Sequence, residues 1–110
     1  MIYLVTKQQS LWTSDRYKVI SAEEALELLA PLNVVELDTE TMGLDPYTKE
    51  LLTVQLGCAD FQVVIDCTSV DIHLFKEYME NPQRIFLGWN IKFDLKFLYH
   101  QRIIPMRVYD

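Results

Sequence analysis

The sequence predicts an α/β protein with a mixed sheet, in which an antiparallel meander is followed by βαβ units. Three apolar runs with strand character, over 34–44, 51–57 and 61–66, follow one another with short polar segments between them. Helical and strand patterns then alternate as far as residue 110. Half of the 110 residues are hydrophobic, and no repeat or linker interrupts the chain. We therefore expect residues 1–110 to form a single domain.

The first part of the chain is expected to contain two short strands and one helix. Ser21 and Glu24 have the spacing of a capping box, in which each side chain binds the backbone N–H of the other residue. Pro31 should end this helix near Ala30, because a residue before proline disfavours the helical conformation. The expected order is an edge strand over 2–6, a polar turn over 7–16, a strand over 17–20 and a helix over 21–30.

Apolar periodicity also sets the expected elements of the second half. The spacing of three residues, 58–60, between two β-branched runs predicts a hairpin. An amphipathic helix is expected next, ending at Asn81-Pro82, with its inner side formed by Val70, Leu74, Phe75 and Tyr78. The expected elements are strands over 51–57 and 61–66, a helix over 70–79, a strand over 84–88, a helix over 90–99 and a strand over 103–109.

Composition limits the class of function. The formal charge of −6 argues against a protein that coats nucleic acid through a broad basic surface. It leaves a nuclease open, because bound metal supplies positive charge where the phosphate lies. Cys58 and Cys67 lack metal-ligand spacing and are expected as reduced, partly buried thiols. With neither a signal peptide nor an apolar run near the ~20 residues of a membrane helix, we expect a cytoplasmic protein with no membrane association.

A buried strand beginning at Val34 carries two acids. On a strand, Asp38 and Glu40 project from one face while Thr39 projects from the other. Two carboxylates at 4 Å repel each other by roughly 4 kcal/mol at an effective dielectric near 20. A divalent cation would offset that repulsion, and hard oxygen ligands favour Mg²⁺ or Mn²⁺. The alternative is an acidic strand end that is open to water.

A third acid, Asp94, lies in the first turns of the helix expected over 90–99. Asn90 has the chemistry of an N-cap residue and is four positions before Asp94, so both are expected on one helix face. Asp94 would by itself complement the positive end of the helix. If the preceding strand neighbours the acidic strand, Asp94 could instead reach Asp38 and Glu40. Three carboxylates in one cleft would predict a metal site.

These stretches resemble the first and second motifs of the DEDD 3′–5′ exonucleases, whose fold is ribonuclease H-like. The matching residues are Asp38-Thr39-Glu40-Thr41-x-Gly43-Leu44-Asp45-Pro46 and Asn90-x-x-Phe93-Asp94. The apolar runs over 51–56 and 63–66 are similar to the meander of the branch that contains ribonuclease D and the proofreading domain of bacterial DNA polymerase I. The resemblance covers roughly residues 33–110.

The resemblance implies a catalytic role for three residues. Asp38 corresponds to the ligand that both metals share. Glu40 corresponds to the carboxylate that holds one metal and orients the attacking water. Asp94 corresponds to the second-motif aspartate, which acts on the other metal directly or through water. The implied chemistry is two-metal hydrolysis with Mg²⁺ or Mn²⁺.

Five further residues match substrate-binding positions of the family. Asn90 corresponds to the asparagine near the 3′-terminal nucleotide, and Leu44 to the leucine that packs on the terminal bases. An ordinary core position is an equal alternative for Leu44. Thr41 and Met42 lie in the same loop, where their backbone could touch the terminal sugar. Phe93 occupies the family's aromatic position, with core packing as its main role.

The sequence departs from the family in one respect. Relatives carry a third motif, a Tyr or His followed by Asp on a later helix, and this sequence does not contain it. Tyr109-Asp110 resembles instead the aspartate that precedes the next helix in relatives. We therefore expect the front part of a longer exonuclease domain, with a ribonuclease H-like sheet that is incomplete at its C-terminal end. Trp89 stands where relatives often carry a polar residue, and Glu36 is an extra acid without an assigned role.

The function expected from the sequence is 3′–5′ exonuclease action on a single-stranded or frayed 3′ end of DNA, of the proofreading type and attached to a polymerase. An RNA-trimming enzyme like ribonuclease D stays open, because nothing in these motifs reads the 2′-hydroxyl. A noncatalytic nucleic-acid-binding module that kept the fold and part of the site is the alternative from another class.

Overall fold

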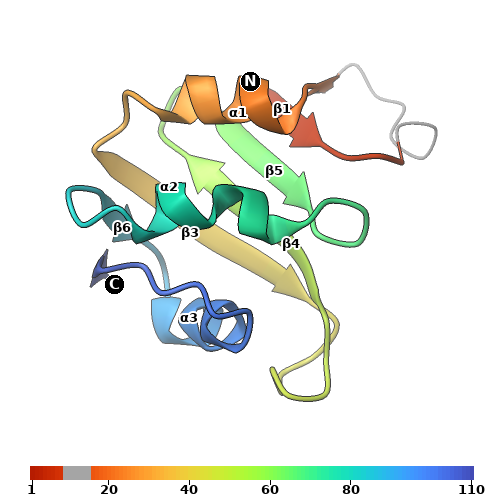
Figure 1. Cartoon of the computed structure of the whole chain (residues 1–110), viewed down its shortest axis with the longest axis vertical. Coiled ribbons are helices and arrows are strands. Elements are labelled where there is room, and N and C mark those ends of the chain that lie inside the picture. Colours follow the sequence, from red (N-terminus) through yellow and green to blue (C-terminus); the bar gives the residue numbers. More distant parts are fainter. Residues whose placement is uncertain (9–15) are drawn as a thin grey trace.

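The computed structural model describes residues 1–8 and 16–110. In these residues, seven strands form one mixed sheet with the order β2-β1-β5-β4-β3-β6-β7 (Figure 1). The strands are β1 (Ile2–Val5), β2 (Tyr17–Val19), β3 (Val34–Thr41), β4 (Leu51–Gly57), β5 (Gln62–Asp66), β6 (Ile85–Leu87) and β7 (Arg107–Tyr109). The helical segments are α1 (Ala22–Leu29), the 3₁₀ turn η2 (Ile72–Phe75), α2 (Lys76–Glu80) and α3 (Ile91–His100).

The strand directions confirm the predicted fold class. β3, β4 and β5 form the antiparallel meander, with β4 between the other two. β6 pairs with β3 and β7 pairs with β6, both in parallel, as expected for βαβ units. On the other side of the sheet, β1 pairs in parallel with β5 and with β2.

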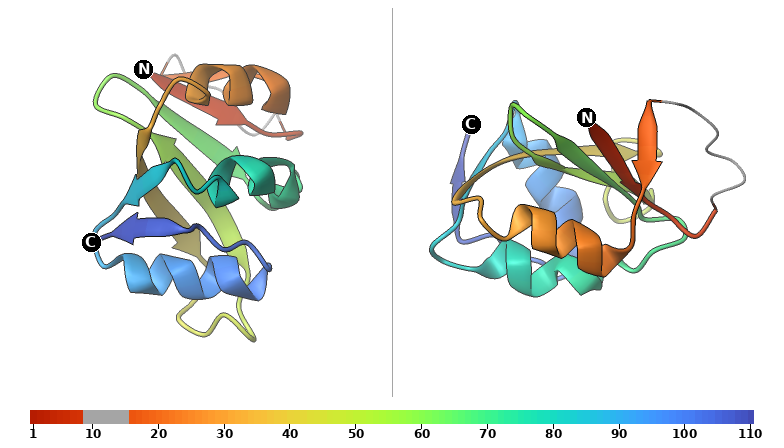
Figure 2. Two further views of the ribbon diagram at one scale, coloured as in Figure 1. Left: turned by 60° about the vertical axis from the view of Figure 1, so that its left-hand side comes forward. Right: turned by 90° about the horizontal axis from the view of Figure 1, so that it is seen from above.

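The core lies between the sheet and the helices that cover one of its faces. Figure 2 shows α1 and α2 on the same side of the sheet. The residues of β3 alternate, so that Val35, Leu37 and Thr39 are buried and the three acids between and beside them are exposed. Glu36, Asp38 and Glu40 therefore define an acidic face of the sheet, opposite to the core. None of the helices among the described residues has the length and apolarity needed to cross a bilayer.

The shortness of β6 determines where α3 lies. β6 pairs only with Val34–Glu36, so the second half of β3 has β4 on one side and no described strand on the other. α3 contacts β3 beside this half (Figure 1). The turn into α3 passes close to β3, because a Cβ on Gly88 would lie 2.8 Å from the carbonyl oxygen of Leu37. A residue other than glycine would push α3 away from β3.

Local signals in the sequence were mostly confirmed. The Ser21–Glu24 capping box is present and α1 ends with Ala30 as its C-cap. β4 and β5 form the expected hairpin. The predicted edge strand was wrong, because β1 lies between β2 and β5. Its weak alternation reflects burial of the adjacent residues Leu4 and Val5, as in an inner parallel strand. Most of the polar turn expected over 7–16 lies outside the described residues.

The helix expected over 70–79 divides into two shorter pieces. Asp71 caps the 3₁₀ turn η2 through the N–H of His73, and α2 follows directly. A 3₁₀ turn has three residues per turn, so Ile72 and Phe75 share its buried side while Leu74 is turned outward. The expectation that Leu74 faces the core was therefore wrong.

Both cysteines are free and half-buried, as the sequence predicted. Burial, together with the charge of the neighbouring Asp66, raises the pKa of the Cys67 thiol to about 12. Asp66 itself is buried and accepts hydrogen bonds from the hydroxyls of Thr6, Thr68 and Ser69. These hydroxyls outweigh the effect of burial and lower the pKa of the Asp66 carboxyl. They also tie the end of β1 to the end of β5.

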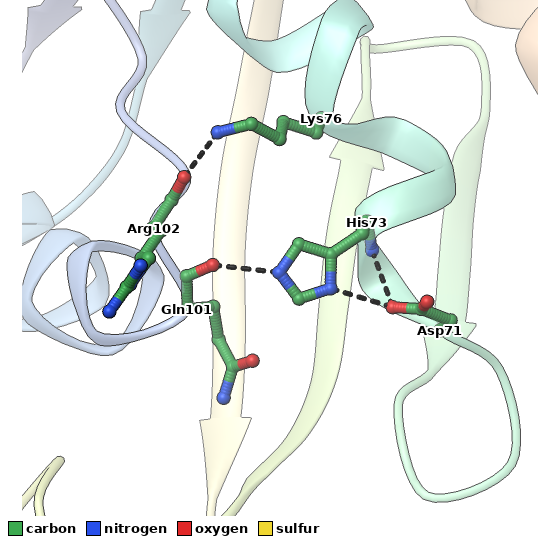
Figure 3. A network of polar contacts seen from close by, with 5 residues as sticks. All are labelled: Asp71, His73, Lys76, Gln101 and Arg102. Atoms are coloured by element: carbon green, nitrogen blue, oxygen red, sulfur yellow. Dashed lines mark hydrogen bonds and ion pairs between the residues drawn. The ribbon is translucent and has the colours of Figure 1, made fainter.

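A polar network joins η2 and α2 to the turn after α3 (Figure 3). His73 Nδ1 lies 2.7 Å from Asp71 Oδ1, and His73 Nε2 lies 2.8 Å from the carbonyl oxygen of Gln101. Both partners are acceptors, so both ring nitrogens can donate only when the imidazole is protonated. Lys76 Nζ binds Glu80 at 2.8 Å and also donates to the carbonyl of Arg102. The network holds the C-terminal end of α3 against η2 and α2.

The network predicts a pH-dependent contribution to stability from His73. The hydrogen bonds to Asp71 and Gln101 raise the pKa of His73 above its ordinary value of 6.5, against the smaller opposing effects of desolvation and of the charge of Lys76. The pKa of Asp71 is lowered by the N–H and ring of His73, so its carboxylate stays ionised in this range. The stabilisation is complete below the unfolded-state pKa of His73 and is lost as pH rises through the higher folded-state pKa.

We therefore expect the Tm difference between the wild type and His73→Gln to be larger at about pH 6 than at about pH 8.5. Thermal unfolding of both proteins, followed by circular dichroism across this range, measures it. His100→Gln is the matched control, because His100 is an exposed histidine outside this network. A Tm difference that does not change with pH would show that the Nδ1 and Nε2 contacts do not require the imidazolium.

Candidate active site

β3 presents Asp38 and Glu40 from the acidic face, as the sequence predicted. Asp38 Oδ1 accepts a hydrogen bond of 2.9 Å from the N–H of Thr39, which fixes one carboxylate oxygen against the strand. The pairing of β3 with β4 shifts register between Glu40 and Thr41, directly after the second acid. Such an irregularity bends a strand and changes the direction of its side chains. The regular pairing of β3 with β4 thus ends directly after Asp38 and Glu40.

α3 brings Asp94 to the same segment of β3. The Oγ1 hydroxyl of Thr39, the residue between Asp38 and Glu40, donates a hydrogen bond to Asp94 Oδ1. Both side chains are buried, with exposed fractions of 6% for Thr39 and 3% for Asp94. Thr39 belongs to the core face of β3, and α3 reaches it from the side of the strand that has no described β-partner. One hydrogen bond therefore fixes the spacing between the two acidic motifs.

The environment of Asp94 disfavours its charged form. Burial is the main cause that raises the pKa of its carboxyl, and the negative charge of Asp38 raises it further. The hydrogen bond from Thr39 acts in the opposite direction but does not cancel these effects. The salt bridges His73–Asp71 and Lys76–Glu80 do not involve Asp38, Glu40 or Asp94, and these acids form no ion pair with another described residue.

The donor set fits a hard divalent cation. Asp38, Glu40 and Asp94 offer only carboxylate oxygens, which Mg²⁺ and Mn²⁺ prefer. Thr53, the cross-strand partner of Glu40, has a buried Oγ1 without a hydrogen-bond partner among the described residues. In residues 1–8 and 16–110, no three His, Cys, Asp or Glu side chains are grouped closely enough to form a complete metal site. The three-carboxylate metal site thus stays a prediction.

Asn90 precedes α3 but does not cap it with its side chain. Its backbone is in the left-handed region, with φ of 52° and ψ of 45°, and its carbonyl oxygen accepts from the N–H of Phe93. Asparagine tolerates this conformation better than most residues. Asn90 is thus the N-cap residue of α3, as the sequence predicted, but its side chain does not make the N-cap hydrogen bond. Its exposed amide makes no cap bond and faces solvent, while its backbone N–H donates to Asp110 Oδ1 at 3.0 Å.

The loop after β3 exposes the other substrate-binding candidates. Leu44 is 84% exposed and Met42 is also exposed, so the core alternative for Leu44 was wrong. The Thr41 hydroxyl donates to the carbonyl of Gly43 at 2.7 Å and closes the start of the loop. Phe93 is half-buried and packs against Phe97, with 5.3 Å between ring centroids, in agreement with its expected core role.

A hollow of about 500 Å³ lies beside Asp38 on the acidic face. We call it the β3 hollow, and its lining includes Glu36, Asp38, Gln62, Trp89 and Asp110. Glu36 Oε2 accepts from Gln62 Nε2 at 3.2 Å, which gives this extra acid a structural partner. Three carboxylates line the hollow and no lysine or arginine does, so its potential is strongly negative.

Sequence reasoning missed two residues that position the site. Thr39 was assigned to the buried face, but its hydroxyl was not recognised as needing a partner. A buried hydroxyl is almost always hydrogen-bonded, so a threonine between two acids on a buried strand was the available signal. Gly88 was treated only as part of a strand end, and its close approach to Leu37 gave no signal in the sequence.

The strand order agrees with the ribonuclease H-like fold that the sequence predicted. A family model described as 3′–5′ exonuclease matches residues 17–110. This match covers most of the chain, so the chain belongs to the 3′–5′ exonuclease family. DNA polymerase I of Aquifex aeolicus is 31% identical over 99 residues, which are 86% of this chain and 16% of that protein. DNA polymerase I of Borreliella burgdorferi is 28% identical over 102 residues, which are 82% of this chain and 11% of that protein.

Solved structures agree on the fold. Escherichia coli RNase D superposes with a TM-score of 0.72 at 18% identity, over 97% of this chain and 26% of that chain. The catalytic core of RRP6 from Trypanosoma brucei gives a TM-score of 0.76 at 14% identity, over 100% of this chain and 28% of that chain. Brucella melitensis NrnC with bound Mg²⁺ gives a TM-score of 0.60 at 25% identity, over 71% of this chain and 41% of that chain. The chain thus spans a small part of the proteins that it matches.

The contact between Thr39 and Asp94 predicts a stability difference between two substitutions. Thr39→Val keeps the shape of the side chain but removes the donor, so the buried carboxylate loses a hydrogen bond that contributes about 1–3 kcal/mol. Thr39→Ser keeps the hydroxyl and should lose less. Urea unfolding measures both free energies, with Thr48→Val in the exposed loop as the control. Equal stability of the valine and serine variants would exclude the hydrogen bond as the cause.

Proposed function

We propose that this chain belongs to a 3′–5′ exonuclease domain that removes nucleotides from the 3′ end of DNA. The observation that supports it most directly is the Thr39–Asp94 hydrogen bond, which brings the second acidic motif to the strand that carries the first. The family match over residues 17–110 supports the same reaction. The proposal treats residues 1–110 as one structural unit.

Asp38, Glu40 and Asp94 are the proposed metal ligands and catalytic residues. Mg²⁺ or Mn²⁺ bound by these carboxylates would lower the pKa of the attacking water and stabilise the leaving 3′ oxygen. The strand keeps Asp38 and Glu40 in one direction, and the hydrogen bond from Thr39 holds Asp94 against the same segment of that strand. Burial and the charge of Asp38 disfavour the ionised form of the Asp94 carboxyl, and no described basic side chain pairs with it, so a bound cation would stabilise that form.

The exposed apolar loop and Asn90 are proposed to hold the terminal nucleotides. Leu44 and Met42 offer apolar surface on which unstacked bases can pack, and neither is used by the core. The Asn90 amide is exposed at the start of α3 and can hydrogen-bond the 3′-terminal sugar or base. Thr41 orders the loop, and Phe93 pairs with Phe97 on α3. A frayed 3′ end is favoured, because the terminal base must leave its stack.

The substrate class follows from the sequence relatives. The two DNA polymerase I proteins support DNA as substrate, a proofreading role and a polymerase domain in the full-length protein. The fold similarity to RNase D keeps an RNA 3′ exonuclease as the second candidate. A cytoplasmic location is part of the proposal.

Manganese titration tests the metal site. We expect two Mn²⁺ ions to bind to the chain, as measured by calorimetry and by the loss of the free Mn²⁺ signal in electron paramagnetic resonance. Asp38→Asn and Asp94→Asn should weaken binding by more than the roughly 10–100-fold that loss of an outer-shell partner costs. Asp60→Asn, at an exposed turn, is the matched control and should bind as the wild type does. One weak ion or none would instead favour a noncatalytic binding module.

The missing third motif predicts little activity from residues 1–110 tested alone. Incubation with Mg²⁺ and a single-stranded oligonucleotide labelled at its 5′ end should give at most a faint ladder of products shortened from the 3′ end. Asp38→Ala should abolish this remaining activity, because Asp38 is the proposed ligand of both metal ions. Brisk turnover that Asp38→Ala abolishes would contradict the prediction and show that another group completes the site.

A further inference from the structure

A second hollow, of about 620 Å³, lies between the loop after β3 and the C-terminal half of α3. We call it the α3 hollow, and its lining includes Asp45, Tyr47, Lys96, Tyr99, His100 and Arg102. The loop that forms one wall continues directly from Leu44, and α3, which forms the other wall, carries Asp94. The α3 hollow thus shares both of its walls with the candidate active site.

The charge of the α3 hollow is opposite to that of the β3 hollow. Lys96 and Arg102 contribute two permanent cations, and Asp45 is the only carboxylate in the lining. Asp45 Oδ1 already accepts from the N–H of Tyr47 at 2.9 Å, as part of the loop's own turn. In a chain of formal charge −6, two cations and a histidine at one hollow are a local exception. A polyanion is attracted to the α3 hollow and repelled by the β3 hollow.

The side chains in the α3 hollow are free to bind a ligand. Tyr47 is 81% exposed, and its ring packs against the edge of His100 with 5.2 Å between centroids. Lys96, Tyr99 and His100 lie on one side of α3, at the spacing of neighbours on a helix surface, while Asp94 points to the opposite side. Figure 3 shows the Arg102 side chain directed away from Lys76, which binds only its backbone carbonyl.

We infer that the α3 hollow binds the single-stranded DNA that leads into the active site, one or more nucleotides before the 3′ terminus. Lys96 and Arg102 bind phosphates, and Tyr47 and Tyr99 offer ring faces for bases. This inference rests on the proposed exonuclease function and adds a second substrate contact to it. The two sides of α3 thereby have different roles: the buried side carries the catalytic Asp94, and the exposed side binds the single-stranded DNA. Binding at the α3 hollow needs no metal.

Fluorescence anisotropy with fluorescein-labelled (dT)₈ in EDTA tests the inference. We expect Lys96→Gln combined with Arg102→Gln to weaken binding and to lower the salt dependence, log K against log salt, by about 0.7 per cation removed. Tyr47→Leu should weaken binding on the order of tenfold, whereas Tyr47→Phe keeps the ring and should retain affinity. The matched control is Lys7→Gln combined with Lys18→Gln, which removes the same charge from exposed sites on the β1–β2 side.

Three results would overturn the inference. The first is no (dT)₈ binding by the wild type, and the second is equal affinity of the Lys96/Arg102 double variant and the Lys7/Lys18 control. The third is displacement of labelled (dT)₈ by an octaglutamate peptide as effectively as by unlabelled (dT)₈. The last would mean a general anion site or an acidic protein partner. Failure of the proposed exonuclease function is recognised separately, because manganese binding would be lost while (dT)₈ affinity in EDTA remained. Conversely, if two Mn²⁺ ions bind but the α3-hollow variants keep the wild-type affinity for (dT)₈, the inference is wrong while the proposed exonuclease function stands.

Discussion

The arrangement of this protein depends on one buried hydrogen bond, from the Thr39 hydroxyl to the Asp94 carboxylate. It joins a strand and a helix that are 55 residues apart in sequence, and it does so between the two acids of the first motif. The bond is possible only because β6 stops pairing at Glu36 and leaves the rest of β3 accessible to α3. Gly88 allows the chain to turn closely past Leu37 into that helix. The position of the Asp94 carboxylate thus depends on the order of the strands, on the short length of β6 and on Gly88.

The Thr39–Asp94 hydrogen bond holds a carboxylate in the core close to β3, whose exposed face carries two further acids, and no positive side chain in the described part of the core neutralises it. Asp94 is buried, its pKa is raised by burial and by Asp38, and the described residues offer these acids no salt bridge. A site built for stability alone would pair or neutralise such groups, because an uncompensated buried charge costs several kcal/mol. The same arrangement is understandable if a divalent cation is the intended partner. This distribution of charge supports the proposed metal site.

The sequence predicted the parts of this structure that depend on local periodicity and failed where distant contacts decide. Alternation placed Asp38 and Glu40 opposite Thr39, and hairpin spacing predicted β4 and β5, because burial of one strand face requires a period of two. The interior position of β1 and the outward rotation of Leu74 depend on pairing and winding that a short pattern does not specify. The left-handed backbone of Asn90 was equally hidden, since asparagine suits both a cap and this conformation.

The opposite charges of the two hollows explain how an acidic domain can act on a polyanion. If the basic side chains were spread over a surface with a net charge of −6, no part of that surface would attract a polyanion. Placed together on α3 and in the turn after it, Lys96 and Arg102 act at short range, where a phosphate feels them more than it feels the acids on the far side of the helix. The β3 hollow, lined by Glu36, Asp38 and Asp110, repels the same strand unless cations are bound there. Under the proposed function, a DNA strand bound at the α3 hollow would approach the acidic face only where bound cations offset its negative charge.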